Sequence, residues 1–154
     1  MSQIERRLSE LNITLPAATA PVASYVPYVI SGNLVVISGQ LPMKDGKPQD
    51  IGKLGQEFSI EQGQQTARQC AINILVQLKA ACGGNLDRVK RCVRLGVFVN
   101  STNNFTDQPK VANGASDLMV AVFGDAGKHA RAAVGVNTLP FGVAVEADAI
   151  FEIN

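Results

Sequence analysis

The sequence of 154 residues is poor in the side chains from which metal and redox sites are usually built. It contains no tryptophan, a single histidine and three cysteines, none of them in a C-x-x-C pair. One histidine cannot form the ligand cluster of a zinc site, and an odd number of unclustered cysteines favours reduced thiols in a cytosol. We therefore expect no metal, no cofactor and a cytoplasmic location.

The sequence also lacks an excess of charge of one sign and any long apolar run. Its 14 basic and 13 acidic residues give a net charge of +1, and the most basic segment, RVKRCVR at 88–94, alternates like a strand. This pattern does not predict a nucleic-acid-binding surface. No run of about 18 apolar residues predicts a membrane-spanning helix, and residues 1–16 lack the apolar segment of a secretory signal. Neither nucleic acid nor membrane is expected as a partner.

What the sequence does contain is the composition of a folded domain, with 46% hydrophobic and 18% charged residues. We expect the whole chain, 1–154, to form one domain, because this length suffices for a sizeable core. Residues 1–20 are expected to form a short helix and an extended arm, which Pro16 and Pro21 favour. Residues 21–154 are expected to form the core of the domain.

Apolar periodicity and turn residues predict the secondary structure along the chain. Helices are expected at about 2–12, 60–82 and 109–123, and strands on both sides of Ser31-Gly32-Asn33 and at 88–100, 131–137 and 143–152. In the strand 88–100, Val93 and Leu95 are expected to share one side. The polar, glycine-rich segment 43–56 is expected to be a surface loop.

The ends of the two long helices are marked by capping residues. Ser59 and Gln62 have the spacing of a capping box before the first, and Gly83 follows its last apolar residues. Pro109 and Gly124 have the corresponding places around the second. These signals predict the helix bounds independently of the apolar pattern.

The element order ββαβαββ predicts an α/β (two-layer α+β) domain, in which both long helices cover one face of a mixed sheet. In the last strand, Val145, Ala147 and Phe151 should face one way, and Glu146 and Asp148 the other. No helix remains to cover this second, half-apolar face. The sequence therefore predicts that copies of the chain associate through the sheet.

Arg131 and Glu146 carry opposite charges on the last two predicted strands, and two interpretations stay open. If residues 131–146 form a hairpin centred on Thr138-Leu139, the two side chains lie opposite each other and form an ordinary ion pair. Alternatively, they form the polar end of a small-molecule pocket. From spacing alone, the ion pair is the simpler interpretation.

Three segments resemble one known family, in the same order and at matching separations. They are YVISGNLVVISGQLP, which ends in S-G-Q-x-P at 38–42, VFVNSTNNF at 97–105, and RAAVGVNTLPFGVAVEADAI at 131–150, with the pattern R-x-x-V-x-x-x-x-L-P-x-x-x-x-V-E. Over about residues 21–154 the chain is similar to the family known as YjgF/YER057c/UK114 or RidA, historically endoribonuclease L-PSP.

The resemblance implies a chorismate-mutase-like fold and a homotrimer with clefts between its subunits. It also implies a hydrolytic deaminase that converts reactive 2-imino acids, or their enamine tautomers, to 2-keto acids and ammonia. Orientation and water placement can suffice for this chemistry without a cofactor. By the same resemblance, Arg131 binds the substrate carboxylate and Glu146 handles the attacking water. The other substrate-binding residues that it implies are Tyr25, Ser38, Gly39 and Asn113.

Several residues depart from the family pattern and predict a divergent subgroup. Ala133 stands where deaminase-active members often have cysteine, SYVPY replaces the usual segment at Tyr25, and the N-terminal helix is an addition. Two alternatives therefore stay open: a non-catalytic trimer that binds small carboxylates or acts as a chaperone, and an endoribonuclease, which the low net charge disfavours. His129 and Asp148 are interpreted as structural, and the cysteines as core thiols.

Overall fold

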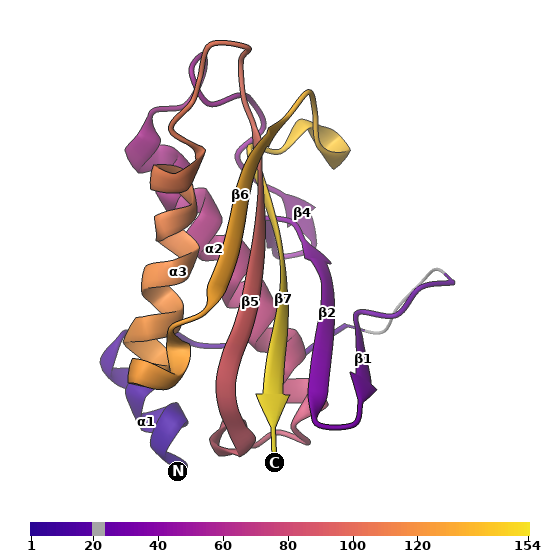
Figure 1. Ribbon diagram of the computed structural model, residues 1–154. Helices are drawn as coiled ribbons and strands as arrows, with labels where there is room; N and C mark the ends of the chain where they lie inside the picture. Colours follow the sequence, from indigo (N-terminus) through magenta and orange to yellow (C-terminus); the bar gives the residue numbers. More distant parts are fainter. Residues whose placement is uncertain (20–23) are drawn as a thin grey trace.

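The computed structural model describes residues 1–19 and 24–154 of the chain. Pro21, where the sequence predicts an extended arm, lies outside these residues. The largest element is a five-stranded sheet of order β1–β2–β7–β5–β6 (Figure 1). Its strands are β1 (Tyr28–Ser31), β2 (Leu34–Gln40), β5 (Val89–Asn100), β6 (Ala130–Val136) and β7 (Val145–Ile153). β5 and β6 are parallel and the other neighbours antiparallel, so the predicted mixed sheet is confirmed.

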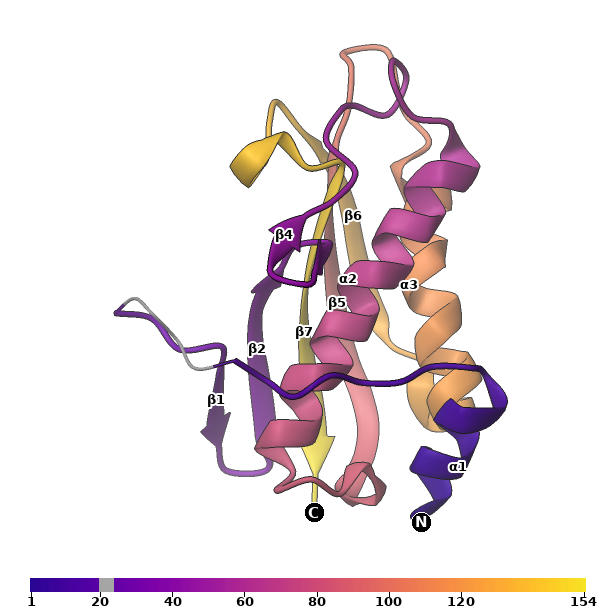
Figure 2. The same cartoon turned by 180° about the vertical axis from the view of Figure 1, so that it is seen from behind.

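Two long helices, α2 (Ile60–Ala81) and α3 (Gln108–Phe123), lie side by side on one face of the sheet (Figures 1 and 2). The predicted capping box is formed, because the Gln62 backbone N–H donates to Ser59 Oγ and the Ser59 N–H donates to Gln62 Oε1. α3 ends at Gly124, whose φ of 63° is one that glycine adopts without strain. The predicted bounds of both helices agree with the structure to within one residue.

The last strand shows the alternation that the sequence predicts. Val145, Ala147 and Phe151 are fully buried beneath the helices, whereas Glu146 and Asp148 remain partly exposed on the other face. We call this second side the open face of the sheet. Apolar side chains on it stay exposed, among them Val29 (53%), Val36 (43%) and Val134 (45%). A sheet face of this kind is suited to contact with another chain.

β6 and β7 do not form the hairpin that would pair Arg131 with Glu146. Both strands pair with β5, which lies between them: Arg131 is next to Leu95, and Glu146 is next to Phe98. The interpretation as a cross-strand ion pair is therefore wrong. Because α3 returns the chain to the same end of the sheet, β6 enters parallel to β5, and β7 is added on the far side of that strand.

The alternation in β5 differs from the prediction. Cys92 and Leu95 are buried, whereas Val93, expected on the same side as Leu95, is only half-buried. The register with β7 shifts between Val89 and Arg91 and again between Cys92 and Arg94. Each β-bulge adds one residue to a strand and reverses the alternation beyond it, which an apolar pattern read in steps of two does not anticipate.

The remaining elements are short. They are α1 (Gln3–Glu10), β3 (Met43–Lys44), β4 (Lys47–Pro48) and the 3₁₀ helices η1 (Leu86–Arg88), η2 (Gly124–Gly127) and η3 (Pro140–Gly142). β3 and β4 form a small hairpin within 43–56, where the sequence predicted only a loop. Asp45 and Gly46 have φ values of 53° and 76°, as a two-residue hairpin turn requires, so the Asp-Gly pair was the overlooked signal.

The predicted N-terminal helix is present as α1 and is fastened to the domain by Asp87. The Asp87 carboxylate accepts hydrogen bonds from the backbone N–H groups of Ile4 (2.9 Å) and Gln3 (3.0 Å), and Ser2 caps the same helix end. These hydrogen bonds, with that from Ile4 first, lower the pKa of Asp87 because they stabilise the ionised carboxylate.

We expect Asp87→Ala to loosen α1 while the sheet and the two long helices keep their structure. Amide exchange in α1 should become about tenfold faster, because two N–H groups at its start lose their acceptor. The same loosening should occur in the parent at low pH. An aspartate whose folded pKa is lowered stabilises above its unfolded pKa, and this contribution is lost as pH falls through the folded value. Asp125→Ala, which removes an exposed aspartate paired with Lys128, is the control; equal exchange in both variants would contradict the prediction.

Candidate functional site

The residues that the resemblance implies fall into two groups on opposite faces of the sheet. We call Arg131, Asn113 and the neighbouring Ser116 the arginine group. We call Tyr25, Ser38, Gly39 and Glu146 the carboxylate group. The register of β5 separates them, because Leu95 and Phe98, the neighbours of Arg131 and Glu146, lie three residues apart and face opposite sides.

The arginine group lies between β6 and α3. Arg131 Nη1 donates hydrogen bonds to Asn113 Oδ1 (2.8 Å) and Ser116 Oγ (3.1 Å), and Nη2 donates to the carbonyl oxygen of Pro109 (3.3 Å). Asn113 and Ser116 are three residues apart on α3, so both side chains leave the helix on the same face. Asn113 and Arg131, which the resemblance implies as substrate-binding residues, thus contact each other within a single chain.

The guanidinium of Arg131 keeps two donors that bond to none of the described residues. A guanidinium has five N–H groups, and the three bonds above use both on Nη1 and one on Nη2. The remaining two belong to Nε and Nη2, the nitrogens along one edge of the planar group. Among the ion pairs of residues 1–19 and 24–154, none includes Arg131. This edge has the donor arrangement that binds a carboxylate.

The carboxylate group is built around a close approach of β7 to β2. An added Cβ on Gly39 would lie 2.8 Å from Glu146 Oε1, so the absence of a side chain at Gly39 leaves the space that the glutamate uses. The β2–β7 register shifts between Ile37 and Gln40, at the residues Ser38 and Gly39. The S-G-Q motif therefore forms a bulge beside Glu146.

Ser38 connects this bulge to the segment that carries Tyr25. Its hydroxyl donates to the carbonyl oxygen of Val26 at 2.7 Å, and its backbone N–H donates to that of Pro27 at 2.9 Å. Both acceptors belong to the two residues that follow Tyr25, so Ser38 holds the segment next to this tyrosine. The Tyr25 side chain is 69% exposed and extends from this segment into solvent.

The surroundings of Glu146 raise the pKa of its carboxyl group. Partial burial raises its pKa, and the nearby Asp148 raises it further. Asp148 itself lies 3.6 Å from Arg94 Nη1, an ion pair that fits the structural role predicted for it. Glu146 forms no ion pair with a described residue. A carboxyl group in this state can accept and return a proton nearer to neutral pH than an ordinary glutamate.

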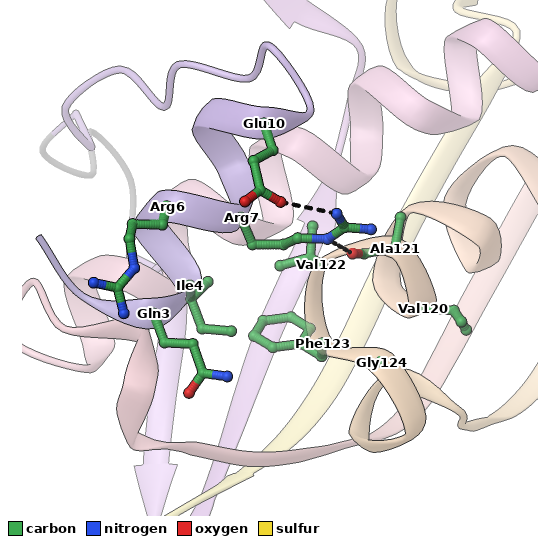
Figure 3. A pocket seen from close by; sticks show the side chains of 10 residues that line it. All are labelled: Gln3, Ile4, Arg6, Arg7, Glu10, Val120, Ala121, Val122, Phe123 and Gly124. Atoms are coloured by element: carbon green, nitrogen blue, oxygen red, sulfur yellow. Dashed lines mark hydrogen bonds and ion pairs between the residues drawn. The ribbon is translucent and has the colours of Figure 1, made fainter.

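A cavity elsewhere in the structure contains none of the predicted site residues. It has a volume of about 410 Å³ and lies where α1 packs on the end of α3, with Gln3, Arg6 and Phe123 among its lining residues (Figure 3). Arg7 crosses the same seam, donating to the carbonyl oxygen of Ala121 at 2.7 Å and pairing with Glu10 at 3.0 Å. We attribute this cavity to helix packing, since the donors and acceptors of the two groups lie outside it.

Two further features concern the described part of the chain. No three His, Cys, Asp or Glu side chains there are grouped as a metal site would require, and no helix there is long and apolar enough to cross a membrane. Cys70, Cys82 and Cys92 are buried and unpaired, as predicted. Burial raises the pKa of each thiol, that of Cys92 to about 12, which makes them poor nucleophiles.

The residue that sequence reasoning missed is Ser116. It touches both Arg131 and His129, whose Nε2 lies 2.8 Å from Ser116 Oγ. Its spacing of three from Asn113 on a predicted helix was the available signal, because residues at i and i+3 share a helix face. Which side chain that face meets depends on the packing of α3 against β6.

Comparison with known proteins identifies the family. Residues 5–145 match the family described as "YjgF/chorismate_mutase-like, putative endoribonuclease". Protein TCP17 of Trypanosoma cruzi is 52% identical over 153 residues, which cover 99% of this chain and 95% of that protein. A protein of known structure from Agrobacterium tumefaciens is 50% identical, with a TM-score of 0.91 over 98% of this chain and 93% of that chain.

RidA from a Psychrobacter species is a more distant relative of known structure. It is 30% identical, with a TM-score of 0.58 over 88% of this chain and 94% of that chain. The higher score and coverage of the Agrobacterium protein agree with the expectation of a subgroup that differs from RidA itself. Together with the match over residues 5–145, these relationships show that the chain belongs to the YjgF/RidA family.

Proposed function

We propose that the protein hydrolyses reactive 2-imino acids, or their enamine tautomers, to 2-keto acids and ammonia, at sites formed between the subunits of a homotrimer. The observation that carries this proposal is the division of the site: Arg131 offers a donor edge on one side of the sheet, and Glu146 lies on the other. Neither group by itself provides both carboxylate binding and proton transfer.

Assembly can bring the two groups together. In a ring of identical subunits, one patch contacts a different patch on the next copy, and the contact repeats until the ring closes. The open face, with Glu146 and the exposed Val36 and Val134, supplies one patch. The side of the domain at β6 and α3, with Arg131, supplies the other. Each interface of the ring then contains one complete site.

The proposed chemistry uses the two groups in turn. The free edge of Arg131 holds the substrate carboxylate, which orients the C=N carbon. Glu146 accepts a proton as water adds to that carbon and forms a C–O bond. It returns this proton to the nitrogen, which gives a neutral carbinolamine. The Glu146 carboxylate then takes the hydroxyl proton of the carbinolamine and passes it to the nitrogen, the C–N bond breaks as the C=O bond forms, and ammonia leaves. No metal or cofactor takes part in these steps.

The alternatives predicted from the sequence are separated by function tests. A non-catalytic carboxylate-binding trimer would use the same arginine edge, but Glu146→Gln would cost it no activity. RNA cleavage finds less support, because the ring nitrogens of His129, the only histidine, are both within hydrogen-bonding distance of other groups of the chain. We therefore favour the imine hydrolase.

We expect Glu146→Gln to lower kcat for 2-iminopropanoate, generated freshly by an amino-acid oxidase, by about 100-fold or more while carboxylate binding persists. In the parent, kcat/KM should fall on the acid side at a pH above that of an ordinary glutamate. The reason is that the raised pKa of Glu146 keeps the proton on the catalytic base up to a higher pH.

Glu152→Gln is the matched control, since Glu152 lies on the same face of β7 and pairs with Lys90. Its pH profile should be that of the parent. If Glu146→Gln retained the acid limb and the parent rate, the protein would bind carboxylates without hydrolysing imines by this route.

A further inference from the structure

A chain of hydrogen-bond contacts leads from the backbone of η2 through His129 and Ser116 to Arg131. His129 Nδ1 lies 2.6 Å from the carbonyl oxygen of Gly127, and Nε2 lies 2.8 Å from Ser116 Oγ. Ser116 Oγ in turn accepts a hydrogen bond from Arg131 Nη1 at 3.1 Å. His129, for which the sequence predicted only a structural role, is thus one side chain removed from the proposed carboxylate-binding group.

Each hydrogen bond in this series, from Gly127 to Arg131, has a defined donor and acceptor. A carbonyl oxygen only accepts, so in the neutral form of the imidazole the hydrogen is on Nδ1 of His129 and Nε2 accepts. The hydroxyl hydrogen of Ser116 is then donated to Nε2, which leaves the Ser116 oxygen free to accept from Arg131. Every donor in this series of hydrogen bonds therefore has an acceptor, and the Ser116 hydroxyl is held in one rotamer.

The Gly127 end of this series of hydrogen bonds is fixed by packing. An added Cβ on Gly127 would lie 2.1 Å from the backbone oxygen of Met119, so η2 lies directly against the backbone of α3. Gly127 is buried, so its carbonyl oxygen lies close to the helix that carries Ser116. An anchor of this kind can restrict the orientation of a flexible guanidinium.

We propose that Ser116 and His129 position Arg131, so that its Nε and Nη2 edge is oriented for the substrate carboxylate before substrate arrives. This inference rests on the proposed function of Arg131. The two residues act through Arg131 and do not touch the substrate. The specificity that they support is for ligands with a carboxylate, since a ligand without one gains nothing from an oriented guanidinium.

The test compares two amides that imitate different halves of the histidine ring. His129→Asn keeps a donor near Nδ1 but does not reach Ser116, whereas the longer side chain of His129→Gln brings an acceptor near Nε2. We expect His129→Asn to raise KM for 2-iminopropanoate and the Kd of pyruvate by about three- to tenfold, with kcat nearly unchanged. His129→Gln should stay within about twofold of the parent. Ser116→Ala should match His129→Asn, and the double variant should add nothing further.

The Kd of pyruvate, measured by calorimetry, needs no turnover and is compared with that of pyruvamide, which lacks the carboxylate. Weaker binding confined to pyruvate supports the inference. Pyruvate binding by His129→Asn at the parent affinity, or equal loss in the Asn and Gln variants, would overturn it. Arg131→Ala in the same assay distinguishes failure of the proposed function from failure of the positioning role. If Arg131→Ala binds pyruvate as the parent does, the proposed function is wrong. If pyruvate binding is lost in Arg131→Ala but kept in the His129 and Ser116 variants, only the positioning role is wrong.

Discussion

Arg131→Ala is expected to lower kcat/KM for 2-iminopropanoate by about 100-fold or more, the largest effect of any single substitution in the arginine group. Two charge-assisted hydrogen bonds from its free edge to the substrate carboxylate are lost, and each is worth about 1.5–3 kcal/mol. Most of the change should be in KM, because the carboxylate is held equally before and during the reaction. Steady-state kinetics at saturating and limiting substrate measure both parameters.

Two variants give this prediction its controls. Arg131→Lys keeps the positive charge without the planar pair of donors and should recover only part of the activity. Arg6→Ala removes an exposed arginine from α1, away from both groups, and should leave the kinetics unchanged. A parent-like KM for Arg131→Ala would show that the free guanidinium edge does not bind the substrate.

At limiting substrate, mixed trimers of Arg131→Ala and Glu146→Gln are expected to regain about one third of the parent activity, although each variant alone is nearly inactive at that substrate concentration. Every mixed ring, with two copies of either variant and one of the other, has one interface at which an intact Arg131 meets an intact Glu146. The two remaining interfaces lack at least one of these side chains. Co-expression with two different affinity tags and sequential purification isolates the mixed rings for assay.

The control for this experiment is a mixture in which no complete interface can form. Arg131→Ala paired with the double variant Arg131→Ala/Glu146→Gln contains no intact arginine and should stay inactive. Native mass spectrometry verifies that both preparations contain mixed trimers. Mixed rings without recovered activity would mean that Arg131 and Glu146 do not serve the same site across an interface.

Local features of the chain were predictable because their causes are local. The Ser59–Gln62 capping box and Gly124 mark the ends of the long helices through contacts within a few residues. The alternation of Val145, Glu146 and Ala147 follows from the geometry of a single strand. The same alternation mispredicted the side of β5 on which Val93 lies, because the bulges in β5 depend on its pairing with the neighbouring strand.

The association of the site residues was predictable only in part. The family resemblance implied Tyr25, Ser38, Arg131 and Asn113 as site residues; in the structure Arg131 donates to Asn113, and Ser38 donates to the carbonyl oxygen of Val26, the residue after Tyr25. The place of Ser116 and the connection from it to His129 were not predictable. Helix periodicity says which residues share a face of α3, but not which strand that face meets.

The sequence by itself determined which side chains carry the proposed chemistry, which strand bears each of them, and that one sheet face stays uncovered. Only the tertiary structure decided the relation between Arg131 and Glu146. They are fifteen residues apart on consecutive strands, a spacing equally compatible with a hairpin and with strands that do not touch. The parallel entry of β6 inserts β5 between them and directs the two side chains to opposite faces. Strand order is set by contacts between segments that are distant in the sequence, so it cannot be predicted from the spacing of residues along the chain.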